Sequence, residues 1–212
     1  WLSGFERSVL TLGSLKKTRA DHGSGVGPVR AYVFVRSAES LCMASLRSDL
    51  RELAVERPLL ALVVSVVAVE VVGASGAVFT AQGLGAWYDS LQQPALAPPN
   101  WVFGPVWTTL FALIGVALWL VWRQADSAPR DVRLAVGVFV VHFVFNLGWS
   151  AVFFGAREIG LGLAVILALW GLIVATMWAF ARVDRRAALL LVPYLLWVSF
   201  ATYLNYGFWT LN

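Results

Sequence analysis

Five apolar segments, each about 20 residues long, dominate the sequence after residue 57. In chain order they are Leu59–Phe79, Phe103–Trp122, Leu134–Phe154, Ile159–Ala181 and Ala188–Trp209. A helix of about 20 residues rises about 30 Å, which is the thickness of the hydrocarbon core of a bilayer. None of the segments alternates apolar and polar residues as a barrel strand does, and backbone polar groups in lipid must be paired within the segment. The sequence therefore predicts an all-α membrane protein, a bundle of five transmembrane helices.

Charge is scarce and unevenly distributed. Only 13% of the 212 residues are charged, against about 25% in a soluble domain. Arginines gather before the first segment, between the second and third, and between the fourth and fifth, and in a five-span bundle these regions share one side. By the positive-inside rule we expect that side to be cytoplasmic, with the amino terminus inside and the carboxyl terminus outside. The bias favours a prokaryotic cytoplasmic membrane, with an organelle membrane as the alternative, and it gives no support to nucleic-acid binding.

Residues 1–57 differ in composition from the rest of the chain. Ser, Gly and Arg are common there, and no segment reaches spanning length. We expect a weakly ordered amino-terminal extension, followed by the transmembrane domain at 58–212. Met43 opens an amphipathic lead-in to the first span, so two alternatives stand for residues 1–42: a native segment, or an extension ahead of a start at Met43.

The connection between the first two spans is rich in tryptophan and proline. It reads "WYDSLQQPALAPPNWVFGPVW" from residue 87 to residue 107. Trp87, Tyr88 and Trp101 are of the type that lies at a membrane interface, where one side of the ring is apolar and the other is hydrated. Prolines fix the backbone, which a mere linker does not need. The stretch therefore predicts a stiff aromatic lid at the mouth of the bundle.

Two spans present aromatic residues at helical spacing. Trp107 and Phe111 are four residues apart in the second span, and Trp197 and Ala201 share a face of the last span. Two indoles on separate helices can bracket a flat apolar macrocycle by offset stacking, in a dry pocket with few polar groups. Ordinary helix packing is the alternative for any single tryptophan in a span.

Ionisable and polar residues within the spans are few. His142, Asn146 and Trp149 follow one face of the third span, and we expect the polar pair to point inward. His142 is either an interhelical hydrogen-bonding group or, through a neutral imidazole, a haem-iron ligand. Glu70 lies in the middle of the first span, and we expect it to pair with His142 or to donate as a protonated acid to a backbone carbonyl.

Four stretches together resemble one family. They are "SGAVFT", the connection quoted above, "FNLGWSAVFFGAREIG" and "PYLLWVSFATYLNYGFWTLN". In order and spacing they are similar to the TspO family of tryptophan-rich sensory proteins and translocator proteins, from about Leu59 to Asn212. The resemblance implies a TspO-type five-helix protein, usually a homodimer, that binds porphyrins such as haem and protoporphyrin IX. It also implies that the first loop covers a pocket between the helices.

The resemblance also assigns residues. The ligand-contacting tryptophans of the family match Trp107 and Trp197, and its pocket asparagine matches Asn146. His142 departs from the family, and no basic residue follows Tyr206 to complete the sterol motif of the mitochondrial members. We expect no catalytic residue, no metal site and no obligatory cofactor, with porphyrin or haem as ligand. The candidate ligand-binding residues are Trp87, Tyr88, Pro98, Trp107, Phe111, His142, Asn146, Trp149, Trp197 and Ala201.

Three functions fit these observations. The first is a membrane receptor or carrier of tetrapyrroles, linked to their transport or to stress sensing. The second is light-dependent degradation of porphyrin with the pocket tryptophans, and the third is a stress-linked scaffold without a dedicated ligand. The sequence contains no hydrolytic, phosphate-binding or paired-carboxylate motif, which favours a binding protein over an enzyme.

Small residues on the fourth span predict either intrachain packing or a homodimer contact: Gly160, Ala164, Ala168, Gly171 and Ala175.

Overall fold

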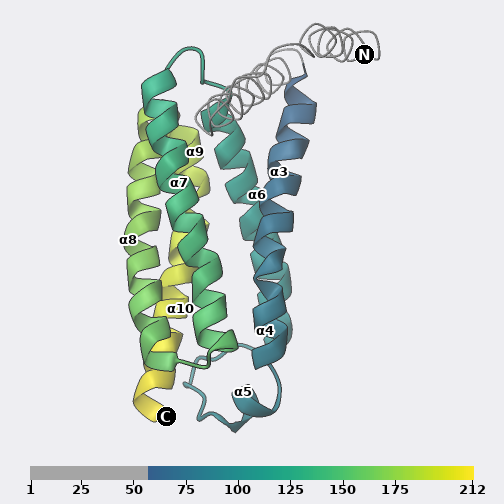
Figure 1. Cartoon of the computed structure of the whole chain (residues 1–212), viewed down its shortest axis with the longest axis vertical. Coiled ribbons are helices and arrows are strands. Elements are labelled where there is room, and N and C mark those ends of the chain that lie inside the picture. Colours follow the sequence, from purple (N-terminus) through teal and green to yellow (C-terminus); the bar gives the residue numbers. More distant parts are fainter. Residues whose placement is uncertain (1–56) are drawn as a thin grey trace, which may run out of the picture. The chain divides into compact units, whose positions relative to one another are not determined.

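A computed structural model describes residues 57–212, and in this part of the chain five long helical spans form a bundle (Figure 1). The spans are Pro58–Gly83, Asn100–Trp122, Pro129–Gly155, Ile159–Val183 and Arg185–Leu211. The predicted all-α fold with five membrane-spanning helices is confirmed. The predictions for residues 1–56, including the alternative start at Met43, lie outside the described residues.

Within the spans and in the link between the first two, the helices carry the following labels and bounds. They are α3 (Pro58–Ser75), α4 (Ala77–Gly83), α5 (Ala86–Ser90), η1 (Asn100–Val102), α6 (Phe103–Trp122), α7 (Pro129–Ser150), the π-helical turn η2 (Ala151–Gly155), α8 (Ile159–Val183), α9 (Arg185–Leu190) and α10 (Val192–Leu211). The third span begins five residues before the predicted Leu134, because hydropathy does not count its charged first turn. Pro129 suits that start, since the first turn of a helix needs no N–H donor at this position.

Two spans are interrupted at identifiable residues. The first divides at Gly76, whose N–H bonds to Gly73 O at 3.0 Å and tightens the turn between α3 and α4. The last divides at Leu191, two residues before Pro193. Proline lacks the N–H that a continuous helix needs and its ring crowds the preceding turn, so α9 ends there and α10 begins.

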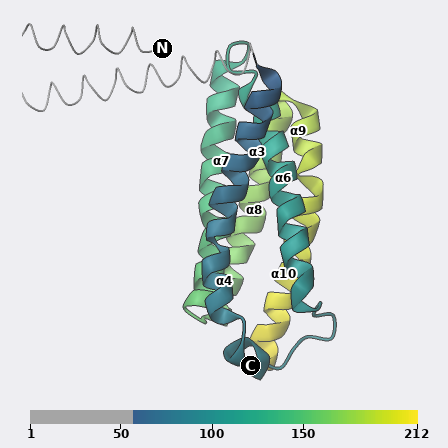
Figure 2. The same cartoon turned by 90° about the vertical axis from the view of Figure 1, so that its right-hand side faces the viewer.

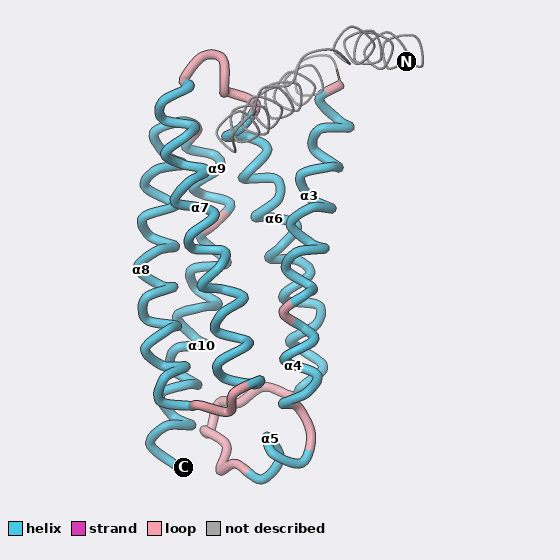
Figure 3. The backbone as a smooth tube through the Cα atoms, in the orientation of Figure 1, coloured by secondary structure: helices cyan, strands magenta, loops and turns pink. Residues whose placement is uncertain are grey.

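The helices pack in a ring of neighbours. α7 lies against α8, α8 against α10, α6 against α9, and α3 against α6 (Figures 1 and 2). Among the described residues, the longest link between two spans joins the first to the second (Figure 3). We call residues 84–102, which include α5 and η1, the connection. The opposite end holds the starts of α3 and α7 together with α9, and we call it the arginine-rich end.

The α3–α6 contact is close because small residues face each other. Ala61, Ser65, Val69 and Gly73 are the buried stripe of α3, at intervals of four residues. The Ser65 hydroxyl donates to Gly115 O at 2.8 Å, so a polar side chain in the span is paired across the helices. The remaining face of α3 is apolar and exposed, as a surface in contact with lipid should be.

Gly115→Ala tests this contact. A Cβ at position 115 would lie 2.6 Å from Val66 Cα, so α3 must move away from α6. We expect a loss of about 1–3 kcal/mol in the free energy of unfolding, the usual cost of overpacking, seen as a lower melting temperature in detergent. Gly171→Ala is the matched control, because no atom lies within 4 Å of its added Cβ. Equal melting temperatures for the two variants would contradict the close contact.

Candidate ligand-binding cavity

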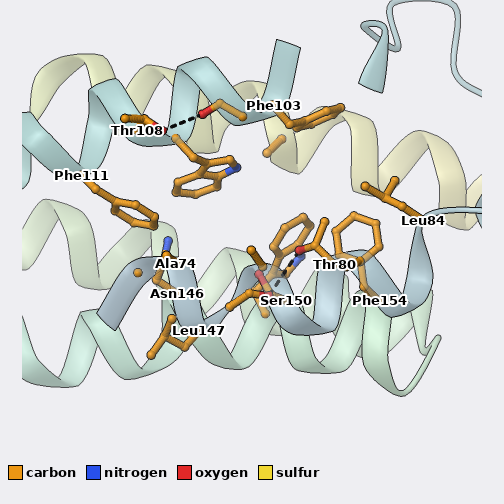
Figure 4. Close-up of a pocket in the computed structure, with 18 of the residues that line it drawn as sticks. Ala74, Thr80, Leu84, Phe103, Thr108, Phe111, Asn146, Leu147, Ser150 and Phe154 are labelled. Carbon is orange, nitrogen blue, oxygen red and sulfur yellow. Dashed lines mark hydrogen bonds between the residues drawn. The ribbon is translucent and has the colours of Figure 1, made fainter. Parts of the chain in front are cut away.

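A cavity of about 380 Å³ lies between the helices in the half of the bundle nearest the connection (Figure 4). Its walls come from α3–α4, α6, α7 with η2, and α10, and α5 and η1 add to them. The lining residues are Glu70, Gly73, Ala74, Gly76, Ala77, Thr80, Ala81, Leu84, Tyr88, Asn100, Phe103, Gly104, Trp107, Thr108, Phe111, Asn146, Leu147, Trp149, Ser150, Phe154, Trp197 and Ala201.

Side-chain hydrogen bonds join α7 to α10. The two helices have little direct backbone contact. Asn146 Nδ2 donates to the Tyr194 hydroxyl at 3.0 Å, and Trp149 Nε1 donates to Asn205 Oδ1 at 3.0 Å. Polar side chains inside a bundle need such partners, because an unpaired group in an apolar medium is costly. The two helices are therefore linked through their side chains, and their backbones remain apart.

The wall formed by α3–α4 is built from small residues. Gly73, Ala74, Ala77 and Thr80 recur at three- and four-residue intervals, so they share one face. A Cβ at Gly73 would lie 2.5 Å from the Phe111 ring. Only glycine lets that ring lie against α3, and the small side chains beyond it leave the cavity open.

The opposite walls are aromatic. Trp107 packs on Phe111 with a centroid distance of 5.2 Å, and Trp197 meets the edge of Phe103 at 5.9 Å. Both indoles border the cavity, and each is held by a different aromatic neighbour. The Trp197 Nε1 donor is buried and has no acceptor among the described residues. A ligand in the cavity would therefore meet two rigid ring systems on separate helices, the arrangement that suits a flat apolar molecule.

Glu70 is the only charged side chain among the described residues that line the cavity. Its carboxyl group has no hydrogen-bond or ion-pair partner in the described part of the chain, and the residue is only partly buried. The expected bond to His142 or to a backbone carbonyl is not formed. The cavity thus contains one carboxyl group and, from residues 57–212, no basic group.

His142 lies outside the cavity, in the closed part of the core. The Thr176 hydroxyl donates to Leu172 O at 2.8 Å, and its oxygen lies 3.2 Å from His142 Nδ1. Because the hydroxyl proton is used, the imidazole donates through Nδ1–H and joins α7 to α8. Nε2 is buried without a partner, and the Phe143 ring is one of those packed around the imidazole. Of the two predicted roles, the geometry matches the interhelical hydrogen bond.

The connection closes one end of the cavity with some of its residues. Leu84, Tyr88 and Asn100 border the cavity, whereas Trp87 and Pro98 do not. Trp87 lies against the edge of Phe153, at a centroid distance of 5.9 Å, within the aromatic cluster that covers this end of the bundle. The connection therefore covers this end of the cavity, mainly with its first residues and with η1.

The middle of the connection is anchored to α10. Pro94 is buried against Gly207, where an added Cβ would lie 2.7 Å from the proline ring. The Asn212 side chain accepts from Gln92 N–H at 2.9 Å and donates to Gln92 O at 3.2 Å. Proline stiffness and these contacts together fix the connection on the bundle, as the proline content predicts.

Seven of the ten predicted site residues border the cavity: Tyr88, Trp107, Phe111, Asn146, Trp149, Trp197 and Ala201. Trp87, Pro98 and His142 lie elsewhere. The sequence analysis missed the α3–α4 wall and the position of Glu70 in the site. The signal for both is the spacing of Glu70, Gly73, Ala77 and Ala81, which puts a carboxyl group and small residues on one helical face.

The fold and the cavity define a class: an integral membrane protein of five helices with an aromatic cavity beside an anchored, proline-rich connection. Residues 64–210 match the TspO/MBR family, and the chain belongs to this family. The predicted family resemblance is confirmed.

Similar proteins occur in bacteria, archaea and animals. The chain is 46% identical over 145 residues to the tryptophan-rich protein TspO of Chlorobaculum tepidum, covering 66% of this chain and 89% of that protein. It is 38% identical over 154 residues to the protein of the same name in Archaeoglobus fulgidus, covering 73% and 98%. It is 40% identical over 126 residues to the translocator protein of Homo sapiens, covering 59% and 75%.

Tyr88 gives the cavity end of the connection a pH dependence. It lies outside the membrane spans, and its burial, with the charge of Asp89 as a smaller cause, raises the pKa of the phenol above 10.0. The folded protein disfavours the phenolate. The contribution of Tyr88 to the free energy of unfolding is therefore fully present below pH 10, and it is lost as the pH rises through the raised pKa. We expect the melting temperature to fall more between pH 9 and about pH 11 in the wild type than in Tyr88→Phe. Parallel curves would contradict the raised pKa.

Proposed function

We propose that this protein binds porphyrins, such as haem and protoporphyrin IX, in the cavity between α3–α4, α6, α7 and α10, and acts as a membrane receptor or carrier for them. The observation that carries the proposal is that Trp107 and Trp197, on separate helices, border one cavity of about 380 Å³. That volume is within the range of about 300–1,000 Å³ typical of small-molecule sites.

The cavity opens sideways, which suits a large flat ligand. Ala77 and Ala81 of α4, and Gly104 and Thr108 of α6, line the cavity and are exposed. α4 and the beginning of α6 diverge toward the connection, and the two helices face each other across the cavity (Figures 2 and 4). A macrocycle placed between the indoles can therefore extend through this opening toward lipid. An apolar ligand dissolved in the membrane reaches the site without crossing water.

Charge sets the orientation of the ligand. Glu70 stands on the cavity wall without a counter-ion, so the anionic propionates of a porphyrin are disfavoured beside it. At the connection end the Arg157 guanidinium lies 5.9 Å from the Trp87 ring centroid and is exposed. The propionates therefore face that end and the water beyond it, with the apolar edge of the macrocycle toward Glu70.

Stacking, and not iron ligation, supplies the affinity in this proposal. His142 Nε2 is enclosed by the core and does not border the cavity. Aromatic pairs contribute about 0.5–1.5 kcal/mol each beyond the burial of area. The metal-free macrocycle is thus as suitable a ligand as haem.

Light-dependent porphyrin degradation is the second candidate function, and one observation favours it. Trp107 and Trp197 would lie directly against the bound macrocycle, where indoles can serve as electron donors to an excited ligand. Illuminating the complex separates the two functions, since loss of ligand that needs light, oxygen and both indoles supports degradation.

The assembly and location proposed for the protein follow the family and the surface. We infer a homodimer in a prokaryotic cytoplasmic membrane, with the arginine-rich end inside. The small residues Gly160, Ala164, Ala168 and Gly171 are exposed along one face of α8, where two helices can approach closely.

A fluorescence titration with protoporphyrin IX tests the proposed site. We expect saturable quenching in the wild type, and a Kd raised about tenfold in Trp107→Ala and in Trp197→Ala, because each variant removes one stacking surface. Trp178→Ala is the matched control: this indole on α8 is 58% exposed and faces away from the cavity. Quenching that does not saturate, or that the control weakens equally, would leave a scaffold role in place of a receptor.

Glu70→Gln tests the orientation. Removing the charge should strengthen binding of protoporphyrin IX by no more than about twofold, because the propionates already lie at the opposite end of the cavity and the substitution only admits the reversed pose. The uncharged dimethyl ester should bind both forms equally. The orientation is wrong if the substitution strengthens binding of the acid severalfold and leaves binding of the ester unchanged, because the propionates then lie beside Glu70.

A further inference from the structure

A second hollow lies on the lipid-facing side of α7 and α8, apart from the cavity. Its volume is about 330 Å³, and it is lined by Arg133, Leu134, Gly137, Val138 and Val141 of α7 and Leu172 of α8. None of these residues borders the cavity described above. We call it the α7–α8 groove.

The groove runs along the helix axis from a charged end to an apolar end. Arg133, Gly137 and Val141 follow each other at four-residue intervals, which spans roughly 12 Å at 1.5 Å per residue. Gly137 is exposed and no atom lies within 4 Å of where its Cβ would stand, so the missing side chain hollows the middle of the groove. Beyond Arg133 every lining side chain is apolar.

The charged end retains its donors. Arg133 Nε donates to Pro129 O at 3.1 Å, and both terminal nitrogens of the exposed guanidinium have no hydrogen-bond or ion-pair partner among residues 57–212. Asp131, the acid nearest in sequence, is 3.1 Å from Arg182 and is thereby engaged. Within residues 57–212, this end of the bundle carries seven of the eight arginines. The potential at the mouth of the groove is therefore positive.

We propose that the α7–α8 groove binds an anionic phospholipid, with its phosphate at Arg133 and one acyl chain along Gly137, Val141 and Leu172. A guanidinium at the membrane interface pairs with phosphate oxygens through two parallel N–H donors, and the groove continues from that point into the hydrocarbon. Basic sites between helices near the membrane surface are a recognised way of selecting anionic headgroups. The proposal does not depend on porphyrin binding.

Charge argues against a second copy of the chain in the same groove. A symmetric contact between two chains of the same orientation would place the two Arg133 side chains near each other at the same depth. Like charges in contact are unfavourable, whereas an anionic lipid neutralises the guanidinium. A zwitterionic lipid offers the same chain without the net charge, so headgroup preference identifies the occupant.

Native mass spectrometry of the full chain tests the site. The purified protein is mixed in detergent with palmitoyl-oleoyl phosphatidylglycerol or with the matching phosphatidylcholine, and retained lipid is counted. We expect retention of phosphatidylglycerol in preference, lowered at least fivefold by Arg133→Gln, which removes the charge, and by Gly137→Leu, which fills the groove. Arg186→Gln at the same end and Ala68→Leu on the exposed face of α3 are matched controls and should retain the lipid.

Four results would overturn the proposal. They are equal retention of phosphatidylcholine, retention unchanged in both groove variants, displacement of the lipid by soluble glycerol phosphate, and a change of oligomeric state in Gly137→Leu. The last would place a second copy on the groove. Arg133→Lys keeps a cation on an exposed side chain and should restore most of the retention, which separates loss of charge from loss of fold.

Discussion

The hydrogen bond from Asn146 to Tyr194 determines the interior of this protein. In a bundle surrounded by lipid, a polar side chain is stable only with a partner, and here the partner lies on a helix that does not pack closely against its own. Trp149, about one turn further along α7, and Asn205, about three turns further along α10, repeat the arrangement. Because each bond pairs a long aromatic side chain with an asparagine, α7 and α10 are joined without close backbone contact. Asn146 and Trp149 of α7 and Trp197 of α10 all border the cavity.

The two ends of the bundle follow opposite packing rules. Toward the arginine-rich end, Gly115 and Ser65 bring α3 and α6 into close contact, with a hydrogen bond across the seam. Toward the connection the small residues of α4 have no such partner on α6, so they border an opening. Small side chains thus give tight packing where the facing helix lies close and a cavity wall where the facing helix diverges. Anchoring of Pro94 on Gly207 keeps the connection across the open end.

Hydropathy predicts the spans well, and the bounds of α6 coincide with the predicted Phe103–Trp122. It predicts helix rotation poorly, since residues facing lipid and residues facing the core are equally apolar. The predicted faces of Trp107, Asn146 and Trp197 are correct because aromatic and polar side chains mark the inner side. His142 is also polar and also faces inward, but it bonds to Thr176 of α8 and not to a group in the cavity. Spacing within one span does not reveal a partner on another helix. The α3–α4 wall was missed because small residues are equally typical of helix contacts.

The central claim is that a planar ligand lies between indoles on separate helices. Anomalous diffraction at the zinc edge, from crystals grown with zinc protoporphyrin, locates the centre of the macrocycle directly. The account predicts one strong zinc peak inside the cavity, flanked by Trp107 and Trp197 and remote from His142. A peak on the lipid-facing surface, or a zinc ion bound by the imidazole of His142, would contradict it.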